Sequence, residues 1–318
     1  MTMGSIMTVT GAIPAESLGT TLAHEHLHCD ISHFSGKKDN VLTDAALIAE
    51  ELGYYRQAGG RSIMEVTPEG IGRDPVKLRE ISKASGVQVI SGIAFYDQST
   101  YPEWLRKADE DRIADYFVRQ IEEGQDGVRA GLIGELMSHN ETKPDPSGYR
   151  LHDLETRVFQ GAARAQQRTG VAISTHAALG RAGHAQLDIL EHSGADLFRV
   201  AIGHCDAHWH EDPEKDLEYY LPILKRGAFC VFDLVGWNEL MPDDVRADRI
   251  VRLLRLGHEK QLMLSTDTCR LSQLHRNGGR GFDHLWASFL PRLQQLGVTC
   301  DQIHSMLVEA PQALLSRG

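Results

Sequence analysis

Short apolar segments that run into a metal-ligating side chain recur along the chain, and they constrain its fold more than any other feature. The first is Leu18-Gly-Thr-Thr-Leu-Ala23, which leads into His24-x-His26. Because residues i and i+2 of a strand point to the same face, these two imidazoles converge on one point. Four further apolar segments each run into a single residue of the same kind: Glu135, His176, His204 and Asp267. We therefore predict a metal site at the carboxyl ends of successive parallel strands.

Strand-like and helix-like segments alternate over the whole chain. Three more apolar segments, 61–67, 87–96 and 228–233, bring the number of expected strands to eight. The segment between two of them, Asp74 to Gly86, has Pro at its first helical position and Gly after its end, which is typical of a helix. Comparable helical patterns cover 43–59, 154–170, 243–257 and 282–297, with a closing helix over 300–318 that is broken at Pro311. We predict one (β/α)8 barrel domain over residues 1–318.

Each proposed ligand has an ordinary structural alternative when it is taken alone. A single His after a strand is commonly a hydrogen-bonded core residue, and a single Asp at a strand–helix junction is commonly a helix N-cap. The H-x-H pattern by itself is weakly specific. Five strand ends that all carry a metal-type group are not explained by these alternatives, so we interpret the set as one site.

Composition excludes several classes of function. The net charge is −11, and no block or stripe of Lys and Arg is present, so we expect no nucleic-acid partner. The five cysteines are scattered and form no C-x-x-C, which favours reduced thiols in a cytoplasmic protein. The sequence contains neither a signal-peptide pattern nor an apolar run of membrane-spanning length, so we expect no membrane association.

Four histidines and two carboxylates exceed the three protein ligands of a catalytic zinc site. They suit two metal ions about 3.5–4 Å apart that share a carboxylate and a hydroxide. We assign His24, His26 and Asp267 to one ion, His176 and His204 to the other, and Glu135 to both. The shared hydroxide would attack the substrate, with Asp267 as the proton acceptor. Zinc is the default for this ligand set, and manganese, cobalt and iron also fit.

At this point the sequence resembles the phosphotriesterase-related branch of the amidohydrolase superfamily. The resemblance runs from about residue 10 to the C-terminus, and the ligands come in the family's order. It is carried by 19–26 (GTTLAHEH), 171–176 (VAISTH), 186–191 (QLDILE), 202–206 (IGHCD), 265–267 (STD), 289–293 (FLPRL) and 308–311 (VEAP). The resemblance implies a (β/α)8 barrel, a binuclear zinc-type site, a homodimer, and hydrolysis of lactones, phosphoesters or related esters.

The chain departs from the family's pattern at three places. Many members bridge their metals with a carboxylated lysine, whereas this chain has Glu135, as in the phosphotriesterase homology proteins. Ala207 and Leu234 stand where strict phosphotriesterases have an Asp–His proton relay. Leu234 also stands where related lactonases have an arginine after Asp233. The chain therefore lacks both the Asp–His relay of strict phosphotriesterases and the arginine of the related lactonases.

Three residues are candidates for substrate binding. Arg270 and Arg280 follow the last strand and could present a guanidinium to a phosphate or carboxylate. Tyr96 ends the third strand and could stand over the metals, as an aromatic residue does in the related lactonases. The alternatives are surface or supporting arginines and an aromatic that packs on a neighbouring loop. Two long loops, 138–148 and 270–281, are expected to shape the pocket.

Three functions remain in competition. The first is a metal-dependent hydrolase of a small-molecule ester, most simply a lactone or a phosphorylated sugar lactone. The second is a phosphoester or phosphotriester hydrolase. The third is a catalytically weak, metal-bearing binding protein, which the presence of all six ligands and of Asp267 disfavours. A serine hydrolase is also disfavoured, because the sequence has no G-x-S-x-G.

Overall fold

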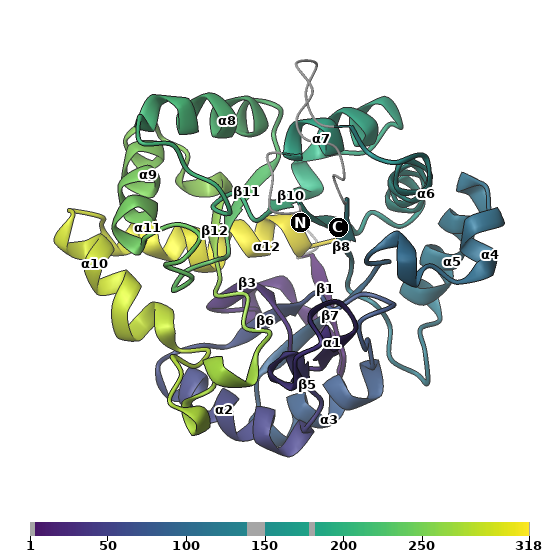
Figure 1. Cartoon of the computed structure of the whole chain (residues 1–318), viewed down its shortest axis with the longest axis horizontal. Coiled ribbons are helices and arrows are strands. Elements are labelled where there is room, and N and C mark those ends of the chain that lie inside the picture. The colour runs from purple at the N-terminus through teal and green to yellow at the C-terminus, as the bar shows by residue number, and fades with distance from the viewer. Residues whose placement is uncertain (1–3, 139–149, 178–181, 318) are drawn as a thin grey trace.

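Eight parallel strands form a nearly closed barrel that is surrounded by helices (Figure 1). The computed structural model describes residues 4–138, 150–177 and 182–317. The barrel strands, in spatial order, are β3 (Thr21–Glu25), β6 (Ser62–Glu65), β7 (Gln88–Ile93), β8 (Leu132–Met137), β9 (Ala172–His176), β10 (Val200–Gly203), β11 (Phe229–Phe232) and β12 (Leu262–Leu264). The eight strands and the barrel predicted from the sequence are thus confirmed.

The helices that surround the barrel include those predicted over 43–59, 74–86, 154–170 and 243–257, together with others, such as 103–107 and 183–192, that were not predicted. They are α2 (Ala45–Gln57), α3 (Pro75–Ser85), α4 (Glu103–Lys107), α5 (Glu110–Glu122), α6 (Asp153–Thr169), α7 (Gly183–His192), α8 (Pro213–Lys225), α9 (Asp243–Arg255), α10 (Leu290–Gln295), α11 (Cys300–His304) and α12 (Ala310–Leu315). The carboxylates of Asp74 and Asp109 accept backbone N–H groups at the starts of α3 and α5. This N-cap bond satisfies donors that a helix start leaves free. The predicted break of the closing helix at Pro311 is wrong, because a π-helical segment (Ser305–Glu309) joins α11 to α12 and the chain stays helical from Cys300 to Leu315.

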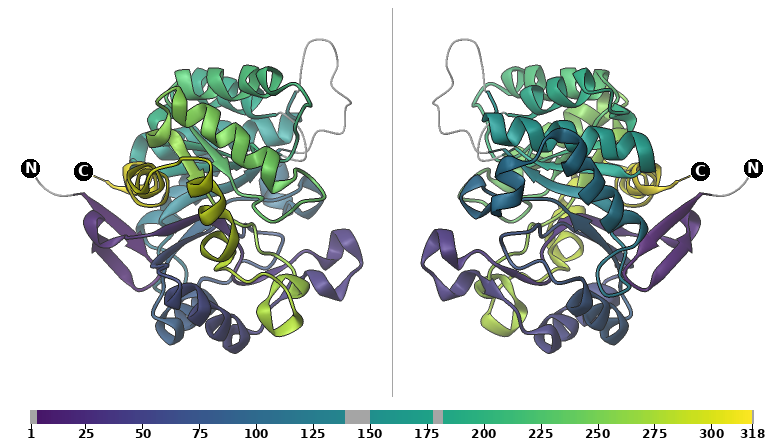
Figure 2. Two further views of the ribbon diagram at one scale, coloured as in Figure 1. Left: turned by 90° about the vertical axis from the view of Figure 1, so that its left-hand side faces the viewer. Right: turned by 90° about the vertical axis from the view of Figure 1, so that its right-hand side faces the viewer.

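One end of the barrel is closed by the two ends of the chain. An antiparallel hairpin of β1 (Ser5–Thr8) and β2 (Gly11–Pro14) lies beside α12, and Ser5 pairs with Arg317. Figure 2 shows both termini and this hairpin at one end, with α1 (Ser32–Ser35) at the other. The hairpin was not predicted, because two four-residue strands carry too little periodicity to be identified. The two-stranded pair of β4 (Cys29–Asp30) and β5 (Val41–Leu42) was missed for the same reason.

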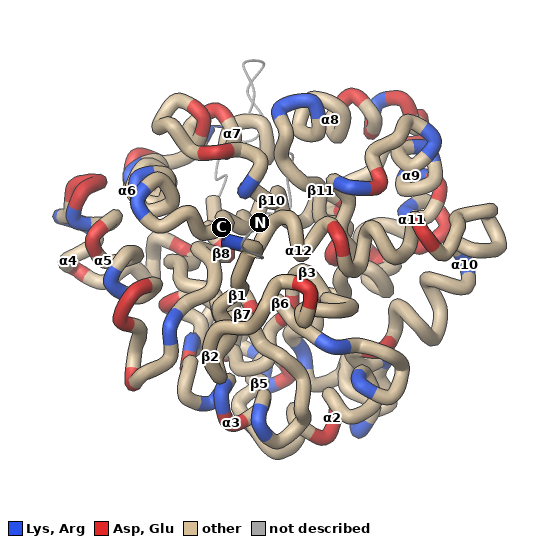
Figure 3. The backbone as a smooth tube through the Cα atoms, turned by 180° about the vertical axis from the view of Figure 1, so that it is seen from behind, with Lys and Arg blue, Asp and Glu red and all other residues tan. Residues whose placement is uncertain are grey.

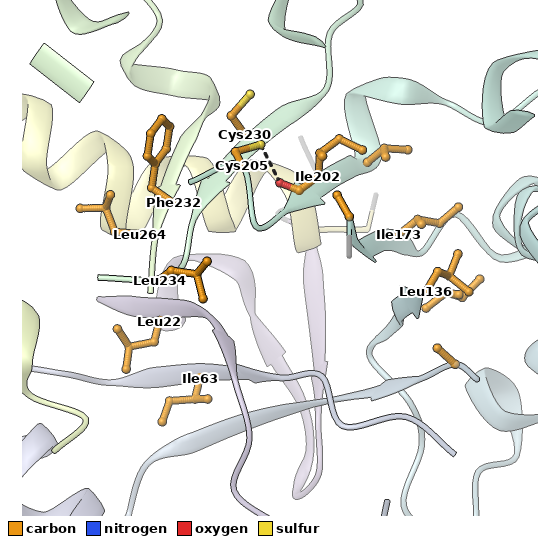
Figure 4. Packing of buried hydrophobic residues seen from close by; sticks show 14 of the residues in the cluster. Leu22, Ile63, Leu136, Ile173, Ile202, Cys205, Cys230, Phe232, Leu234 and Leu264 are labelled. Atoms are coloured by element: carbon orange, nitrogen blue, oxygen red, sulfur yellow. Dashed lines mark hydrogen bonds between the residues drawn. The ribbon is translucent and has the colours of Figure 1, made fainter. Parts of the chain in front are cut away.

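Each barrel strand contributes to two apolar layers. Leu22, Ile173 and Phe232 belong to the large cluster between strands and helices, part of which Figure 4 shows. Their neighbours Ala23 and Ala172 belong to a second cluster inside the barrel. This alternation is the expected consequence of a two-residue period in a covered parallel sheet.

The strand ladder is irregular at two proposed ligands. The pairing of β3 with β6 shifts between Leu22 and Glu25, and that of β8 with β9 shifts between Ile133 and Leu136. Such shifts change the direction of the intervening side chains. Strict alternation would place His24 on the same side as Leu22, among the apolar residues under the helices. The shifts instead accompany the turning of His24 and Glu135 toward the other ligands.

Charges of both signs are interspersed over the outer elements, as Figure 3 shows from behind. No helix among the described residues is both long and apolar enough for a membrane span. Of the two long loops, 139–148 lies outside the described residues. The loop 270–281 contains the short turns Leu271–Gln273 and His275–Asn277.

Candidate metal centre

The six proposed ligands lie together although they come from the carboxyl ends of five strands, β3, β8, β9, β10 and β12. Within the part of the chain that the structure describes, two groups made only of proposed ligands are compact enough to hold a metal ion, with their ligand atoms within 4.8 Å of one another. One group is His24, His26 and Asp267, and the other is Glu135, His176 and His204. The histidines and Asp267 are grouped as in the assignment made from the sequence, whereas Glu135, assigned there to both ions, forms a compact group only with His176 and His204.

The first group takes its ligands from the first and the last barrel strands, β3 and β12. His26 Nε2 lies 3.2 Å from Asp267 Oδ1, and His24 Nε2 lies 3.9 Å from the same oxygen. All three residues are buried. A carboxylate and two imidazoles in this arrangement are suitable ligands for zinc or a similar divalent ion.

Glu135 lies between the two groups. Its Oε2 is 2.9 Å from His176 Nδ1 and 3.1 Å from His24 Nε2, while its Oε1 is 3.7 Å from His26 Nε2. Oε2 therefore lies near one histidine of each group, and Oε1 lies near a second histidine of the first group. A carboxylate with two oxygens in this position is suited to bridge two cations.

Outer side chains lie at Nδ1 of three of the four imidazoles, with hydrogen-bond geometry at His26 and His204 and as a close carboxylate contact at His24. Asp233 Oδ1 lies 2.8 Å from His204 Nδ1, and Asp233 Oδ2 lies 3.2 Å from His24 Nδ1. His26 Nδ1 lies 2.9 Å from Thr67 Oγ1. In each ring the Nδ1 atom faces an outer partner, so Nε2 is left to face the centre.

Asp233 was not identified as a site residue from the sequence. The signal was present, because Asp233 directly follows β11 just as His204 directly follows β10. It forms a third compact group with His24 and His204, which it contacts at their Nδ1 atoms. Its place behind both metal groups indicates a positioning role rather than a ligand role.

The nitrogen atoms of His24 fit a site that takes a cation. His24 is fully buried, and among the described residues neither ring nitrogen has a partner with hydrogen-bond geometry, although carboxylate oxygens lie 3.1 and 3.2 Å away. In the second group, His204 Nε2 and His176 Nδ1 lie only 2.9 Å apart. A bound cation would accept the lone pairs of nitrogens that face the centre, including His24 Nε2.

The carboxylates and imidazoles of the centre shift one another's pKa values. Burial opposes charge on His26 and His204, but hydrogen bonds and charges from Asp267 and Asp233 outweigh it. The pKa of His26 is raised to about 9 and that of His204 to about 10. Burial likewise opposes charge on Glu135 and Asp267, yet the neighbouring histidines hold both pKa values far below the usual range. Both carboxylates are therefore ionised at neutral pH.

Two of the ligands have an unusual backbone conformation. His204 has φ of 54° and Asp267 has φ of 46°, in the left-handed region that non-glycine residues rarely occupy. Such conformations persist only where the surroundings enforce them, and they cluster at functional sites. At His204 a hydrogen bond stabilises this conformation, because its backbone N–H donates to Asp233 at 2.9 Å.

A buried ion pair supports Asp233 from behind. Asp206 accepts the backbone N–H of Asp233 at 3.2 Å and that of Leu234 at 3.1 Å. Asp206 also accepts Arg246 Nε, and both side chains are fully buried. Ala207 and Leu234 are buried and apolar, so they cannot carry a proton away from the centre.

Tyr96 lies at the edge of the centre. Its ring is 5.6 Å from that of His176 and 5.5 Å from that of Phe34, which is among the exposed large apolar residues. Burial, followed by the charges of Glu135 and Asp267, raises the pKa of Tyr96 well above its usual value. Its hydroxyl is therefore protonated at neutral pH and can donate a hydrogen bond.

The two candidate arginines occupy different environments. Arg280 donates to the carbonyl oxygens of Thr266 at 2.7 Å and Gly236 at 3.3 Å. Arg270 instead stacks on Trp237, with its Cζ 4.3 Å from the ring centroid, and its side chain is 41 % exposed. Of the two, Arg270 has the guanidinium that solvent and a ligand can reach.

The chain matches a family model described as the phosphotriesterase family over residues 4–315. It is 35% identical to the phosphotriesterase homology protein of Escherichia coli, over 92% of this chain and 96% of that protein. It is also 28% identical to the N-acetyltaurine hydrolase of Danio rerio, over 98% of each chain.

Solved structures of related proteins are also similar to this chain. The crystal structure of the Escherichia coli protein, complexed with phosphate in its active site, superposes with a TM-score of 0.86 at 33% identity, covering 94% of this chain and 99% of that one. A mutant of a PTE-like lactonase from Deinococcus radiodurans superposes with a TM-score of 0.83 at 29% identity, covering 98% and 99%.

Proposed function

The chain belongs to the phosphotriesterase family, and from this premise we propose that it hydrolyses an ester-type bond in a small molecule with two bound divalent metal ions. The observation that carries this proposal is the pair of compact ligand groups with Glu135 between them. A protein that needed a metal only for stability would require a single closed site.

We assign the site residues two roles, metal binding and proton transfer. His24, His26 and Asp267 would hold one ion, His176 and His204 the other, and Glu135 would contact both. When bound, the two ions would lower the pKa of a shared water and polarise the bond to be cleaved. Asp267 is ionised at neutral pH and faces the centre, so it can accept the proton that the attacking water loses. Zinc is the ion we expect, from the histidine-rich ligand set.

We take a lactone or a phosphorylated sugar lactone as the substrate. The exposed guanidinium of Arg270 supports an anionic group on that substrate, because a guanidinium pairs well with phosphate or carboxylate. The phosphate in the active site of the Escherichia coli relative also supports an anionic group on the substrate. Phosphotriester hydrolysis is the weaker alternative here, since Ala207 and Leu234 provide no proton relay.

Amide hydrolysis is a second candidate. It is favoured by the relatives named N-acetyltaurine hydrolases, which align with nearly the whole of this chain. The same metal-assisted attack on a carbonyl carbon would serve an amide and a lactone.

The first experiment combines metal analysis with turnover. We expect close to two zinc ions per chain and hydrolysis that stops on chelation and returns with zinc. A panel of lactones, N-acetylated amines and phosphoesters, each with and without an anionic group, would select the substrate class. Metal-free protein after reconstitution, with no turnover of any class, would refute the proposal and favour a binding protein.

A variant pair tests the anionic group. Arg270→Ala should raise KM for the anionic member of a substrate pair by about 10–100-fold, as expected for the loss of a charged hydrogen bond, and leave the neutral member unchanged. Arg276→Ala is the matched control, because Arg276 is an exposed arginine of the same loop that pairs with Glu50. Equal effects on both substrates would argue against anion recognition by Arg270.

A further inference from the structure

We propose that Glu25, the residue between the two histidines of the first strand, is a positioning residue that holds Asp267 in place. The proposal rests on the proposed function, because it treats Asp267 as a metal ligand. Glu25 ends β3 and is fully buried, so its carboxylate is shielded from water. A polar side chain in such a place is retained only where hydrogen bonds compensate for the lost hydration.

The carboxylate of Glu25 holds the backbone on both sides of Asp267. Its Oε1 accepts the backbone N–H of Thr266 at 2.7 Å and the hydroxyls of Ser265 and Thr266, each at 2.7 Å. Its Oε2 accepts the backbone N–H of Thr268 at 2.7 Å. The residues before and after Asp267 are thereby fixed to one side chain, which accounts for how Asp267 keeps its left-handed φ of 46°.

These contacts lie at the seam of the barrel. The strand ladder runs from β3 through β12, and within the described residues no ladder joins β12 back to β3. Ser265 connects the two sides instead, since its hydroxyl accepts the backbone N–H of His24 at 3.0 Å and donates to Glu25. Side-chain hydrogen bonds thus replace the missing strand pairing.

The two metal groups depend on this seam to different degrees. The group of His24, His26 and Asp267 takes its ligands from both sides of the seam. Glu135, His176 and His204 come from β8, β9 and the end of β10, which are paired neighbours in the sheet. Loosening the seam should therefore weaken the first group and leave the second nearly unchanged.

Arg280 belongs to the same arrangement. Thr266 O accepts Arg280 at 2.7 Å and the indole N–H of Trp237 at 2.8 Å, so the carbonyl of this residue is held as firmly as its N–H. This gives Arg280 a supporting role in the loop after β12, in contrast to the exposed Arg270.

The test compares Glu25→Gln with Glu51→Gln. Glu51 is also a buried glutamate, and it accepts two backbone N–H groups, from His275 and Arg276, in the same loop. Each zinc-loaded protein is titrated with a chromophoric chelator, and Co²⁺-loaded protein is examined by absorption spectroscopy. In Glu25→Gln we expect one of the two sites to lose affinity by about 10–100-fold, the range for a lost outer partner. Its residual Co²⁺ spectrum should match that of His26→Ala, which lacks a ligand of the same site.

A milder variant keeps the test usable if Glu25→Gln does not fold. Thr266→Val removes one hydroxyl bond to Glu25 and preserves the backbone bond, and it should weaken the same site to a smaller extent. Two sites with wild-type affinities in both variants would overturn the proposal, and so would equal weakening of both sites. Failure of the wild-type protein to bind two ions would instead count against the proposed function, so the two failures are distinguishable.

Discussion

Asp233 should control the affinity of both metal sites at once. It contacts His24 of one group and His204 of the other, at 3.2 and 2.8 Å, and both contacts are made at Nδ1. In Asp233→Asn the shape is kept, but one oxygen becomes an N–H₂ group that meets an imidazole N–H or the backbone N–H of His204. The negative charge that supports both rings is also lost.

The size of the effect follows from the number of contacts. Loss of one outer partner of a metal-ligating histidine costs about 10–100-fold in affinity, or about 1.4–2.8 kcal/mol. Because each metal group has one histidine that contacts Asp233, we expect a loss of this size at both sites. Glu25→Gln, by contrast, should weaken only one.

The assay is competition for zinc with a chromophoric chelator, fitted to two sites. Asp216→Asn is the control, because Asp216 is also a fully buried aspartate that accepts backbone and arginine donors, away from the centre. A wild-type affinity at either site of Asp233→Asn, with a loss confined to the other, would refute the role of Asp233 as a shared support.

Three further predictions concern the ligands themselves. Asp267→Asn should keep most of the bound metal and lower kcat by about 10²–10⁴-fold, as expected for removal of a proton acceptor, and unchanged turnover would disprove that role. Glu135→Ala should reduce the zinc content, measured by elemental analysis, to one ion per chain or fewer, whereas two tightly held ions would rule out a bridge. The third concerns pH: in the metal-free protein the pKa values of His26 and His204 are raised to about 9 and about 10 from 6.5. The stability that these raised pKa values contribute is fully present below pH 6.5 and is lost as pH rises through 9 to 10. The Tm of the metal-free protein should therefore fall over this range. The zinc-loaded protein should lack this fall, because its ligand histidines are already deprotonated.

The eight strands, the order of the ligands and the kinds of donor they offer were predictable from the amino-acid sequence. Apolar runs and helix caps are local patterns, and the carboxyl ends of parallel barrel strands meet at one face whatever the details of packing. The proximity of His24 to Asp267, which are far apart in the chain, therefore followed from the fold class.

Local patterns could not decide how the side chains are aimed. The register shifts at His24 and Glu135 depend on pairing between neighbouring strands. The imidazole nitrogen that faces the centre depends on Asp233 and Thr67, which come from other strands. Arg280 was equally plausible as a substrate ligand until its donors were seen on backbone carbonyls.

Glu25 shows the limit most clearly. In the sequence it is the residue between two histidines, and nothing near it in the chain indicates a partner. Its hydrogen bonds reach Ser265, Thr266 and Thr268, about 240 residues away, and they form because the barrel brings its first and last strands together. The amino-acid sequence determined which chemical groups are available, whereas tertiary structure alone decided their partners, because contacts between distant segments leave no periodic pattern in the chain.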